Sequence, residues 1–408
     1  MTVTLADVAA RAGVSAATVS RVLNGNYPVA DSTRERVLRA VDELEYVVNG
    51  PARALAAATS DLVGVLVNDI ADPFFGILAG AAQTEIARGA GPSGTPAPAG
   101  SGTPSGHPGG KLAVVCNTGG SPAAELTYLT LLQRQRAAGV ILTGGAVEGT
   151  EHTAAVADRL ARLAAQGTRI VLCGRPGVEA ESIPRARPEE APTRGAGVFG
   201  ASGGAPASWP GARRPRTPAP RGGEPVPGPV TLAFDNRGGA YALTAHLLAL
   251  GHRRIGYAAG PVDRTTTRER LEGHRAALAA HGVDPAGRPT AHGPYERGYG
   301  CRAAVELLAR DPGLTAVVAA NDTIALGVCA ALRERGLRVP EDVSVAGFDD
   351  LPFSVDAAPA LTTVRLPLHE AGAWAGRLVM GAEAPPPGDR ALVEAALTVR
   401  ASTAPPRG

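Results

Sequence analysis

Polar side chains follow several short apolar runs of this 408-residue chain, at the points where strands of a sheet would end. Carboxylates and side-chain amides exchange hydrogen bonds with hydroxyl groups, and ligands of open α/β sheets bind beyond the carboxyl ends of the strands. The pattern therefore predicts a site for a small molecule that carries vicinal hydroxyls. The strand-end residues are Asn68, Asp69, Asp235, Asn236, Asn321, Asp322, Asp349 and Asp350.

Aromatic and cationic side chains fit the same chemistry. Phe74 and Phe75 can cover the apolar face of a sugar ring, and Arg270 offers a fork of donors to a hydroxyl or a carboxylate. A structural alternative stays open for each, because a strand-end Asp often caps the next helix and the Phe pair also suits a hydrophobic core. Asp235 and Asn236 fit helix capping better than ligand contact. His252 fits the end of a helix better than a metal site.

Other site chemistries lack the residue spacing that they need. The four cysteines lie far apart, which predicts free thiols in a reducing cytoplasm and no zinc site. Residues 200–204 match the G-x-S-x-G nucleophile elbow, but no strand precedes them and no helix follows. The sequence also has no phosphate loop. We therefore expect no enzyme, no metal and no cofactor.

The elements that would position the strand-end residues are short β-rich runs separated by stretches of helical periodicity, such as 240–250 and 269–280. Continuous apolar strands that alternate with helices indicate parallel sheets covered on both faces. Eight such strands are enough for two α/β lobes. The runs are residues 62–67, 112–116, 139–143, 169–173, 230–234, 254–258, 315–319 and 343–347.

Two stretches interrupt this alternation. Residues 89–110 are rich in Gly, Pro and Ser, and residues 177–228 are rich in Pro, Gly and Arg with few apolar side chains. Both compositions predict disordered surface insertions. No apolar run approaches the length of about eighteen residues that spans a membrane, and the N-terminus has no charged-then-apolar leader, so we expect a cytoplasmic protein.

The first 24 residues have the pattern of two short helices. Apolar residues recur at helical spacing after Thr4, a suitable N-cap, and Gly13 ends the first helix. Ser15 can cap a second helix. Two helices joined by a Gly-containing turn are typical of a helix-turn-helix, whose second helix enters the DNA major groove. An ordinary helical hairpin is the alternative from periodicity alone.

Charge does not add to this prediction. The net charge of the whole chain is +2, and residues 1–60 hold six arginines and six acidic residues. Because these charges cancel, DNA binding by this segment must depend on the placement of particular side chains and not on a basic surface.

The run DVAARAGVSAATVSRVLNG (7–25) resembles the DNA-binding headpiece of the LacI/GalR (lactose-repressor) family of transcription regulators, and the resemblance continues through a third helix at 33–46. The later stretches VNDIADPFF, ANDTIALG and VSVAGFDD resemble the family's two-lobed sensor. The resemblance implies an all-α helix-turn-helix headpiece followed by an α/β periplasmic-binding-protein-like sensor with parallel sheets.

Site residues follow by matching positions to the family. For operator DNA, the resemblance implies contacts from Thr4, Ser15, Ala16, Ala17, Thr18, Ser20, Arg21, Asn24, Asn49, Arg53 and Leu55, with Leu55 as a minor-groove wedge. For the effector, it implies Asn68, Phe74, Phe75, Arg270, Asn321 and Asp349.

We therefore predict a homodimeric, or tetrameric, repressor whose affinity for operator DNA is controlled by a sugar-like effector bound between two lobes. A solute-binding protein without a regulatory role and a regulator with a nucleobase-type corepressor remain the alternatives. The expected domains are a headpiece at 1–48, a hinge at 49–60, an N-terminal lobe at 61–173 with about 366–390, and a C-terminal lobe at 174–365 with about 391–402.

Overall fold

The computed structural model describes residues 3–24, 29–44, 60–89, 110–176 and 228–407. The N-terminal headpiece contains three helices. They are α1 (Leu5–Ala12), α2 (Ala16–Asn24) and α3 (Asp31–Glu43).

Capping residues define the first turn of the headpiece as the sequence predicts. The Thr4 side chain accepts from the backbone N–H of Asp7, and the Asp7 carboxylate accepts from the backbone N–H of Thr4, which makes a capping box. Gly13 ends α1 in the left-handed conformation (φ 64°), which glycine adopts without steric cost. Val8, Val19 and Val37 are fully buried and pack the three helices around one small core.

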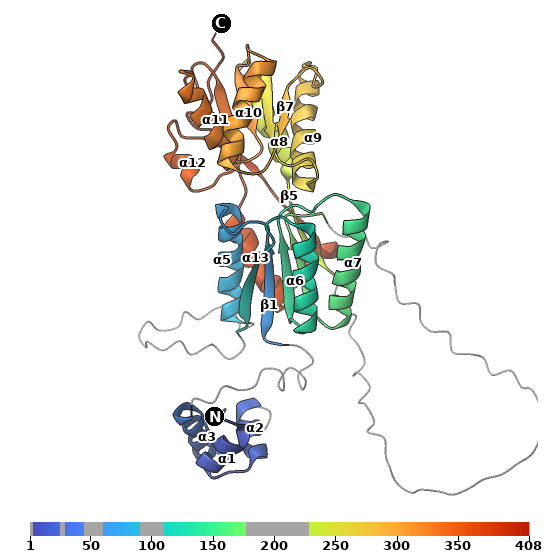
Figure 1. The fold of residues 1–408 in the computed structure, drawn as a ribbon, viewed down its shortest axis with the longest axis vertical. Coiled ribbons are helices and arrows are strands. Elements are labelled where there is room, and N and C mark those ends of the chain that lie inside the picture. The colour runs from blue at the N-terminus through green and yellow to red at the C-terminus, as the bar shows by residue number, and fades with distance from the viewer. Residues whose placement is uncertain (1–2, 25–28, 45–59, 90–109, 177–227, 408) are drawn as a thin grey trace, which may run out of the picture.

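The N-terminal lobe of the sensor is a six-stranded sheet in the order β11-β5-β4-β3-β1-β2, and every neighbouring pair is parallel. Helices α5 and α13 lie against each other on one face of this sheet, and α6 and α7 cover the other (Figure 1). The strands are β1 (Leu62–Val67), β2 (Leu112–Asn117), β3 (Gly139–Thr143), β4 (Arg169–Cys173), β5 (Val230–Phe234) and β11 (Arg390–Val393). The helices are α5 (Pro73–Arg88), α6 (Pro122–Arg134), α7 (Thr150–Ala165) and α13 (Leu368–Met380), with a short 3-10 helix at Pro387–Asp389.

The C-terminal lobe has a second six-stranded sheet in the order β12-β10-β9-β8-β6-β7, parallel except for the edge strand β12. Helices α8 and α9 pack as one pair and α10 and α11 as another. The strands are β6 (Ile255–Ala259), β7 (Thr290–His292), β8 (Ala316–Ala319), β9 (Ser344–Asp349), β10 (Thr362–Arg365) and β12 (Ala396–Thr398). The helices are α8 (Asn236–Ala249), α9 (Thr265–Ala280), α10 (Arg297–Arg310), α11 (Asp322–Glu334) and α12 (Phe353–Asp356).

The lobe boundaries predicted from the sequence are wrong in two places. Strand β5 pairs with β4 in the N-terminal sheet, although the predicted boundary at residue 174 gave it to the C-terminal lobe. Strand β11, assigned largely to the C-terminal lobe, pairs with β5 in the same N-terminal sheet. The predicted boundary was placed at the start of the long Pro/Gly-rich stretch before β5. In the structure, the chain enters the C-terminal lobe only after β5.

The eight apolar runs all form strands. The helical stretches at 240–250 and 269–280 fall in α8 and α9, with Leu250 as the C-cap of α8. No helix among the described residues is long and apolar enough to cross a bilayer. The stretches at 90–109 and 177–227, which include the elbow-like residues 200–204, lie outside the described residues, as does the hinge up to residue 59.

Candidate functional site

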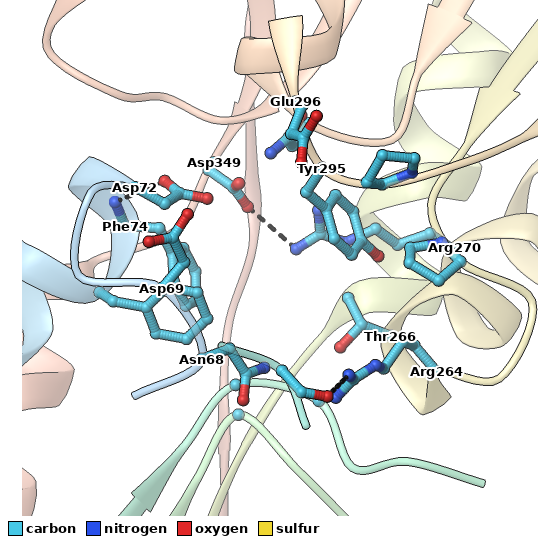
Figure 2. Close-up of a pocket in the computed structure, with 18 of the residues that line it drawn as sticks. Asn68, Asp69, Asp72, Phe74, Arg264, Thr266, Arg270, Tyr295, Glu296 and Asp349 are labelled. Carbon is cyan, nitrogen blue, oxygen red and sulfur yellow. Dashed lines mark hydrogen bonds and ion pairs between the residues drawn. The ribbon is translucent and has the colours of Figure 1, made fainter. Parts of the chain in front are cut away.

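A cavity of about 390 Å³ lies between the two lobes, beyond the carboxyl ends of both sheets (Figure 2). All six residues expected to bind an effector line it, and so do several residues that the sequence did not indicate. From the N-terminal lobe it is lined by Asn68, Asp69, Asp72, Phe74, Phe75, Gly119, Gly120, Gly144, Gly145, Gly174 and Phe234. From the C-terminal side it is lined by Asn236, Pro261, Arg264, Thr266, Arg270, Pro294, Tyr295, Glu296, Asn321 and Asp349.

Arg270 is the central polar residue of the C-terminal wall. It projects from α9, is 3% exposed, and donates to the Asn236 side chain, to the carbonyl of Ala320 and to the Asp349 carboxylate. Its guanidinium also stacks 3.8 Å from the ring centre of Phe348. These contacts fix the orientation of the guanidinium before any ligand arrives.

Asp349 is the last residue of β9, and Asn321 follows the adjacent strand β8, at the edge of the sheet that faces the cavity. Burial raises the pKa of Asp349, while the nearby Arg270 lowers it and offsets part of this effect. Asn321 caps α11, because its Oδ1 accepts from the backbone N–H of Ile324. The capping and cavity-lining interpretations of Asn321 therefore both hold, and its amide nitrogen is the group available to a ligand.

Aromatic rings form the N-terminal wall. Phe74 and Phe75 begin α5 and meet edge to face at 5.0 Å, and Phe74 meets Phe234 in the same way at 6.0 Å. Both α5 rings are buried in the core and also line the cavity. Asn68 stands beside them after β1, where its Oδ1 accepts from Thr118.

Acidic residues border this wall. Asp72 caps α5 through the backbone N–H of Phe74, and burial together with the neighbouring Asp69 raises its pKa. Glu296 and Tyr295 face the cavity from the opposite lobe (Figure 2). Tyr295 is held by a 2.8 Å hydrogen bond to Thr267.

The prediction that Asn236 caps a helix is wrong. Asp235 caps α8, as expected, by accepting from the backbone N–H of Gly238. The Asn236 side chain is instead buried at the cavity, where it accepts from Arg270 and donates to Glu269. His252 follows α8, and its Nε2 lies 2.8 Å from the carbonyl of Ala404.

Some of the remaining lining residues could have been found from spacing. Thr266 precedes Arg270 by four residues, so the two share one face of α9. Tyr295 and Glu296 follow β7. This strand has only three residues and is too polar to be predicted from the sequence.

The lobes also touch at one side of the cavity through a set of contacts that we call the interlobe clasp, formed by residues 144–148 and 263–268. Glu148 N–H donates to the carbonyl of Asp263 (2.7 Å), and Thr265 N–H donates to the carbonyl of Ala146 (3.1 Å). The Thr265 hydroxyl accepts from Ala146 N–H, and Arg268 forms an ion pair with Glu148. Backbone and side-chain contacts thus close this side of the cleft.

Glycines permit this close approach. A Cβ atom added to Gly145 would lie 2.2 Å from the Thr266 hydroxyl and 3.2 Å from the Thr266 backbone nitrogen. Arg264 crosses between the lobes to donate to the carbonyl of Gly120 (Figure 2). The clasp is therefore a fitted contact in which larger side chains would collide.

In the headpiece, α2 presents a polar and small-residue face. Ser15, Ala16, Ala17 and Arg21 are exposed, whereas Val19 and Val22 turn inward. Ser15 also caps α2 through the backbone N–H of Thr18, whose side chain is half-buried like that of Ser20. Asn24 is the last residue of α2, while Asn49, Arg53 and Leu55 lie outside the described residues.

Both the headpiece and the sensor match models of known protein families. Residues 4–49 match the model of bacterial regulatory proteins of the lacI family, and residues 244–403 match the model of a periplasmic binding protein-like domain. The HTH-type transcriptional regulator MalR of Streptomyces coelicolor is 34% identical over 414 residues, covering 99% of this chain and 97% of MalR.

Two solved structures are similar over nearly the whole chain. A complex of the transcriptional regulator CelR with cellobiose has 29% identity and a TM-score of 0.58, covering 98% of this chain and 99% of that one. The lac repressor dimer bound to operator and the anti-inducer ONPF has a TM-score of 0.69 at 24% identity, covering 99% and 100%. The chain is thus a member of the lacI family of bacterial regulatory proteins, a helix-turn-helix transcriptional regulator with an effector-binding sensor of two α/β lobes.

Proposed function

We propose that this protein is a cytoplasmic, homodimeric repressor whose affinity for operator DNA changes when a sugar binds between the sensor lobes. The observation that carries the proposal is the make-up of the interlobe cavity, where a buried, pre-oriented Arg270–Asp349 pair faces a wall of phenylalanine rings. Carboxylates, amides and a guanidinium suit ring hydroxyls, and aromatic faces suit the apolar side of a sugar.

The effector contacts in this proposal are Asn68, Phe74, Phe75, Arg270, Asn321 and Asp349, joined by Asn236. The similar CelR structure holds cellobiose, which supports a neutral saccharide as the ligand class here. We further propose that the protein binds its ligand without converting it, so that a bound sugar is released unchanged.

For DNA, we propose that α2 enters the major groove and that Ser20 and Arg21 reach base edges, with Thr4, Ser15 and Thr18 near the phosphates. The hinge at 49–60 would place Asn49, Arg53 and Leu55 at the minor groove between two half-sites. The domain arrangement that we propose is a headpiece at 1–48, an N-terminal lobe formed by 61–234 with 368–393, and a C-terminal lobe formed by 235–365 with 396–403.

A dimer follows from the geometry of the headpiece, because one α2 helix offers few base contacts and paired half-sites multiply them. The exposed Leu112 and Val114 on the edge strand β2 support a protein contact on the N-terminal lobe. Light scattering of the purified protein would separate a dimer from a tetramer.

A single experiment tests the proposal. The purified protein is given cellobiose, ribose or guanine, and both the unfolding temperature and the affinity for an operator selected from random duplexes are measured. A ligand at 100 times its dissociation constant stabilises the folded state by about 2.7 kcal/mol. A sugar that raises the unfolding temperature and shifts operator affinity supports the proposal, and the direction of the shift identifies induction or co-repression.

Other outcomes contradict it. If guanine alone has both effects, the effector is a nucleobase-type corepressor. If a sugar stabilises the protein but leaves operator affinity unchanged at saturation, the cavity does not control DNA binding. The variant Arg270→Ala serves as the control, because any genuine effect of the cavity should disappear in it.

A further inference from the structure

A second buried carboxylate lies directly behind the effector cavity. Asp322 is the first residue of α11, is fully buried, and is absent from the cavity lining. One of its oxygens accepts from the backbone N–H of Leu351 (2.8 Å) and from the Ser354 hydroxyl (2.7 Å). The other accepts from the Thr363 hydroxyl (2.6 Å).

Two of the partners of Asp322, Leu351 and Thr363, hold one turn, which we call the Asp349 turn and define as residues 349–351. Leu351 N–H binds Asp322 directly. Asp350 N–H lies 3.4 Å from the Thr363 oxygen, which accepts from it while donating its own proton to Asp322. Both amides that follow Asp349 are therefore tied to the same carboxylate.

This turn needs external support because its backbone is strained. Asp349 has φ 105° and Asp350 has φ 55°, so two consecutive non-glycine residues lie at positive φ. Such residues are unfavourable relative to ordinary backbone, and the conformation persists only where its surroundings impose it. This backbone carries the Asp349 carboxylate that accepts from Arg270.

The packing around Asp322 also depends on a neighbouring glycine that leaves room for this carboxylate. Gly347 lies on β9, two residues before Asp349, and a Cβ atom added there would come within 2.2 Å of Asp322 Oδ1. Burial raises the pKa of Asp322 to about 6, while its three hydrogen bonds lower it. All three partners donate to the carboxylate, and hydrogen bonds to an ionised carboxylate are the stronger kind.

We propose that Asp322 is a positioning residue for the effector site, which holds the Asp349 turn through Leu351 N–H and the Thr363 hydroxyl without touching the ligand. This inference rests on the proposed effector role of Asp349. It assigns Asp322 of the chain's ND stretch and Asp349 of its FDD stretch to different tasks: Asp349 faces the cavity, and Asp322 fixes the turn that carries it.

The test uses Thr363, because a change there breaks the relay with little change in volume. In Thr363→Val the hydroxyl is lost, whereas Thr363→Ser keeps it. Hydrogen exchange followed by mass spectrometry should show roughly tenfold faster exchange in the segment 349–354 of Thr363→Val, and wild-type exchange there in Thr363→Ser. Thr244→Val is the matched control, since it removes another buried hydroxyl, on α8, away from the turn.

Exchange in the β6 and β8 segments should be unchanged in Thr363→Val, which separates local release of the turn from general destabilisation. Equal exchange in Thr363→Val and wild type would overturn the inference. So would acceleration of the same size in Thr363→Ser, because a retained hydroxyl should restore the turn. Asp322→Asn provides a second variant, in which the segment 349–354 should again exchange faster than its surroundings.

Cellobiose titration connects the turn to the site. We expect Thr363→Val to bind cellobiose roughly tenfold more weakly than wild type and Thr363→Ser to bind it normally. If Arg270→Ala abolishes binding but Thr363→Val does not weaken it, the positioning role is wrong and the proposed function stands. If no saccharide binds the wild type while Thr363→Val still releases the turn, the support by Asp322 stands as a structural fact and its proposed role in effector binding falls.

Discussion

The guanidinium of Arg270 donates to the carboxylate of Asp349 at 2.9 Å, and both side chains are 4% exposed. Such a buried pair contributes little net stability, because the cost of removing two charges from water offsets their attraction. The two residues come from α9 and β9, and both line the cavity between the lobes. The arrangement provides a fixed set of donors and acceptors for a ligand, at a position where hydrophobic packing would have been simpler.

Arg270→Ala should abolish the effector response and leave operator binding intact, since the DNA-contacting helices are in a separate domain. Removing one partner of a buried pair typically costs about 3 kcal/mol of folding stability. Fluorescence anisotropy with labelled operator, with and without sugar, measures both properties. Arg275→Ala, an exposed site on the same helix, is the matched control. A wild-type sugar titration in Arg270→Ala would remove this residue from the site.

Gly145→Ala should open the interlobe clasp, because the new methyl group would overlap the Thr266 hydroxyl. We expect weaker sugar binding and a larger radius of gyration in small-angle scattering. The double variant Gly145→Ala with Thr266→Ala should recover part of the loss, since the nearest colliding atom is gone. Additive effects of the two changes would show that the lobes do not depend on this contact.

Arg21→Ala should weaken specific operator binding by roughly 1–3 kcal/mol if the side chain reads a base. Non-specific binding should fall much less, so the ratio of the two affinities is the informative quantity. Arg39→Ala removes the same charge from an exposed site on α3 and is the control. An unchanged ratio in Arg21→Ala would assign this arginine to the phosphate backbone.

Leu55→Ala should reduce the bend that the dimer induces in operator DNA, because an apolar wedge unstacks a base step in the minor groove. Circular-permutation gels with the selected operator measure the bend. The same gels with Ala54→Gly test whether any small change in the hinge has this effect. A normal bend with Leu55→Ala would exclude the wedge.

The stability of the sensor should decrease in mild acid through His274. Burial lowers the pKa of this imidazole to about 3, whereas the unfolded chain takes up the proton near pH 6.5. Between these values the unfolded state binds more protons, so the free energy of unfolding falls as the pH falls, by up to about 1.4 kcal/mol per pH unit. His274→Phe, which keeps a ring beside Tyr257, should lose roughly 2 kcal/mol less than wild type between about pH 7 and about pH 5.

Urea denaturation at the two pH values provides the measurement. The geometry also fixes the tautomer of His274: the Thr244 hydroxyl donates to the carbonyl of Ala240, so it must accept from His274 Nδ1–H. Nε2 then carries the lone pair and has no hydrogen-bond partner in the described part of the chain. If the free energy of unfolding fell equally with pH in wild type and in His274→Phe, groups other than His274 would govern the acid sensitivity.

The strands were predictable because buried parallel strands are continuous apolar runs, and each of the eight runs is a strand. The edge strands β7 and β12 have three residues each, and the runs flanking them are not apolar enough to be recognised. The assignment of β5 to a lobe depends on its pairing with β4 and β11, which are distant in sequence. No local pattern reports such a pairing.

The cavity-lining residues were predictable at the carboxyl ends of central strands, where Asn321 and Asp349 lie. Tyr295 and Glu296 enter it from a loop whose path depends on the fold of the whole C-terminal lobe. The sequence indicates Asp322 only as one of several acidic residues at strand ends. Only the structure distinguishes its three inward hydrogen bonds from the cavity-facing position of Asp349.

The chain returns from the C-terminal lobe to the N-terminal lobe to form α13 and β11, and this return has a consequence for biosynthesis. Helix α13 packs against α5 so tightly that a Cβ atom on Gly372 would lie 2.4 Å from the carbonyl of Leu78, and β11 forms the edge of the N-terminal sheet beside β5. Both elements are made after α8 to α12 and β6 to β10 of the C-terminal lobe. On the ribosome, the N-terminal lobe must therefore wait, with the apolar face of α5 uncovered, until nearly all of the C-terminal lobe has emerged. The lobe that begins first is completed last.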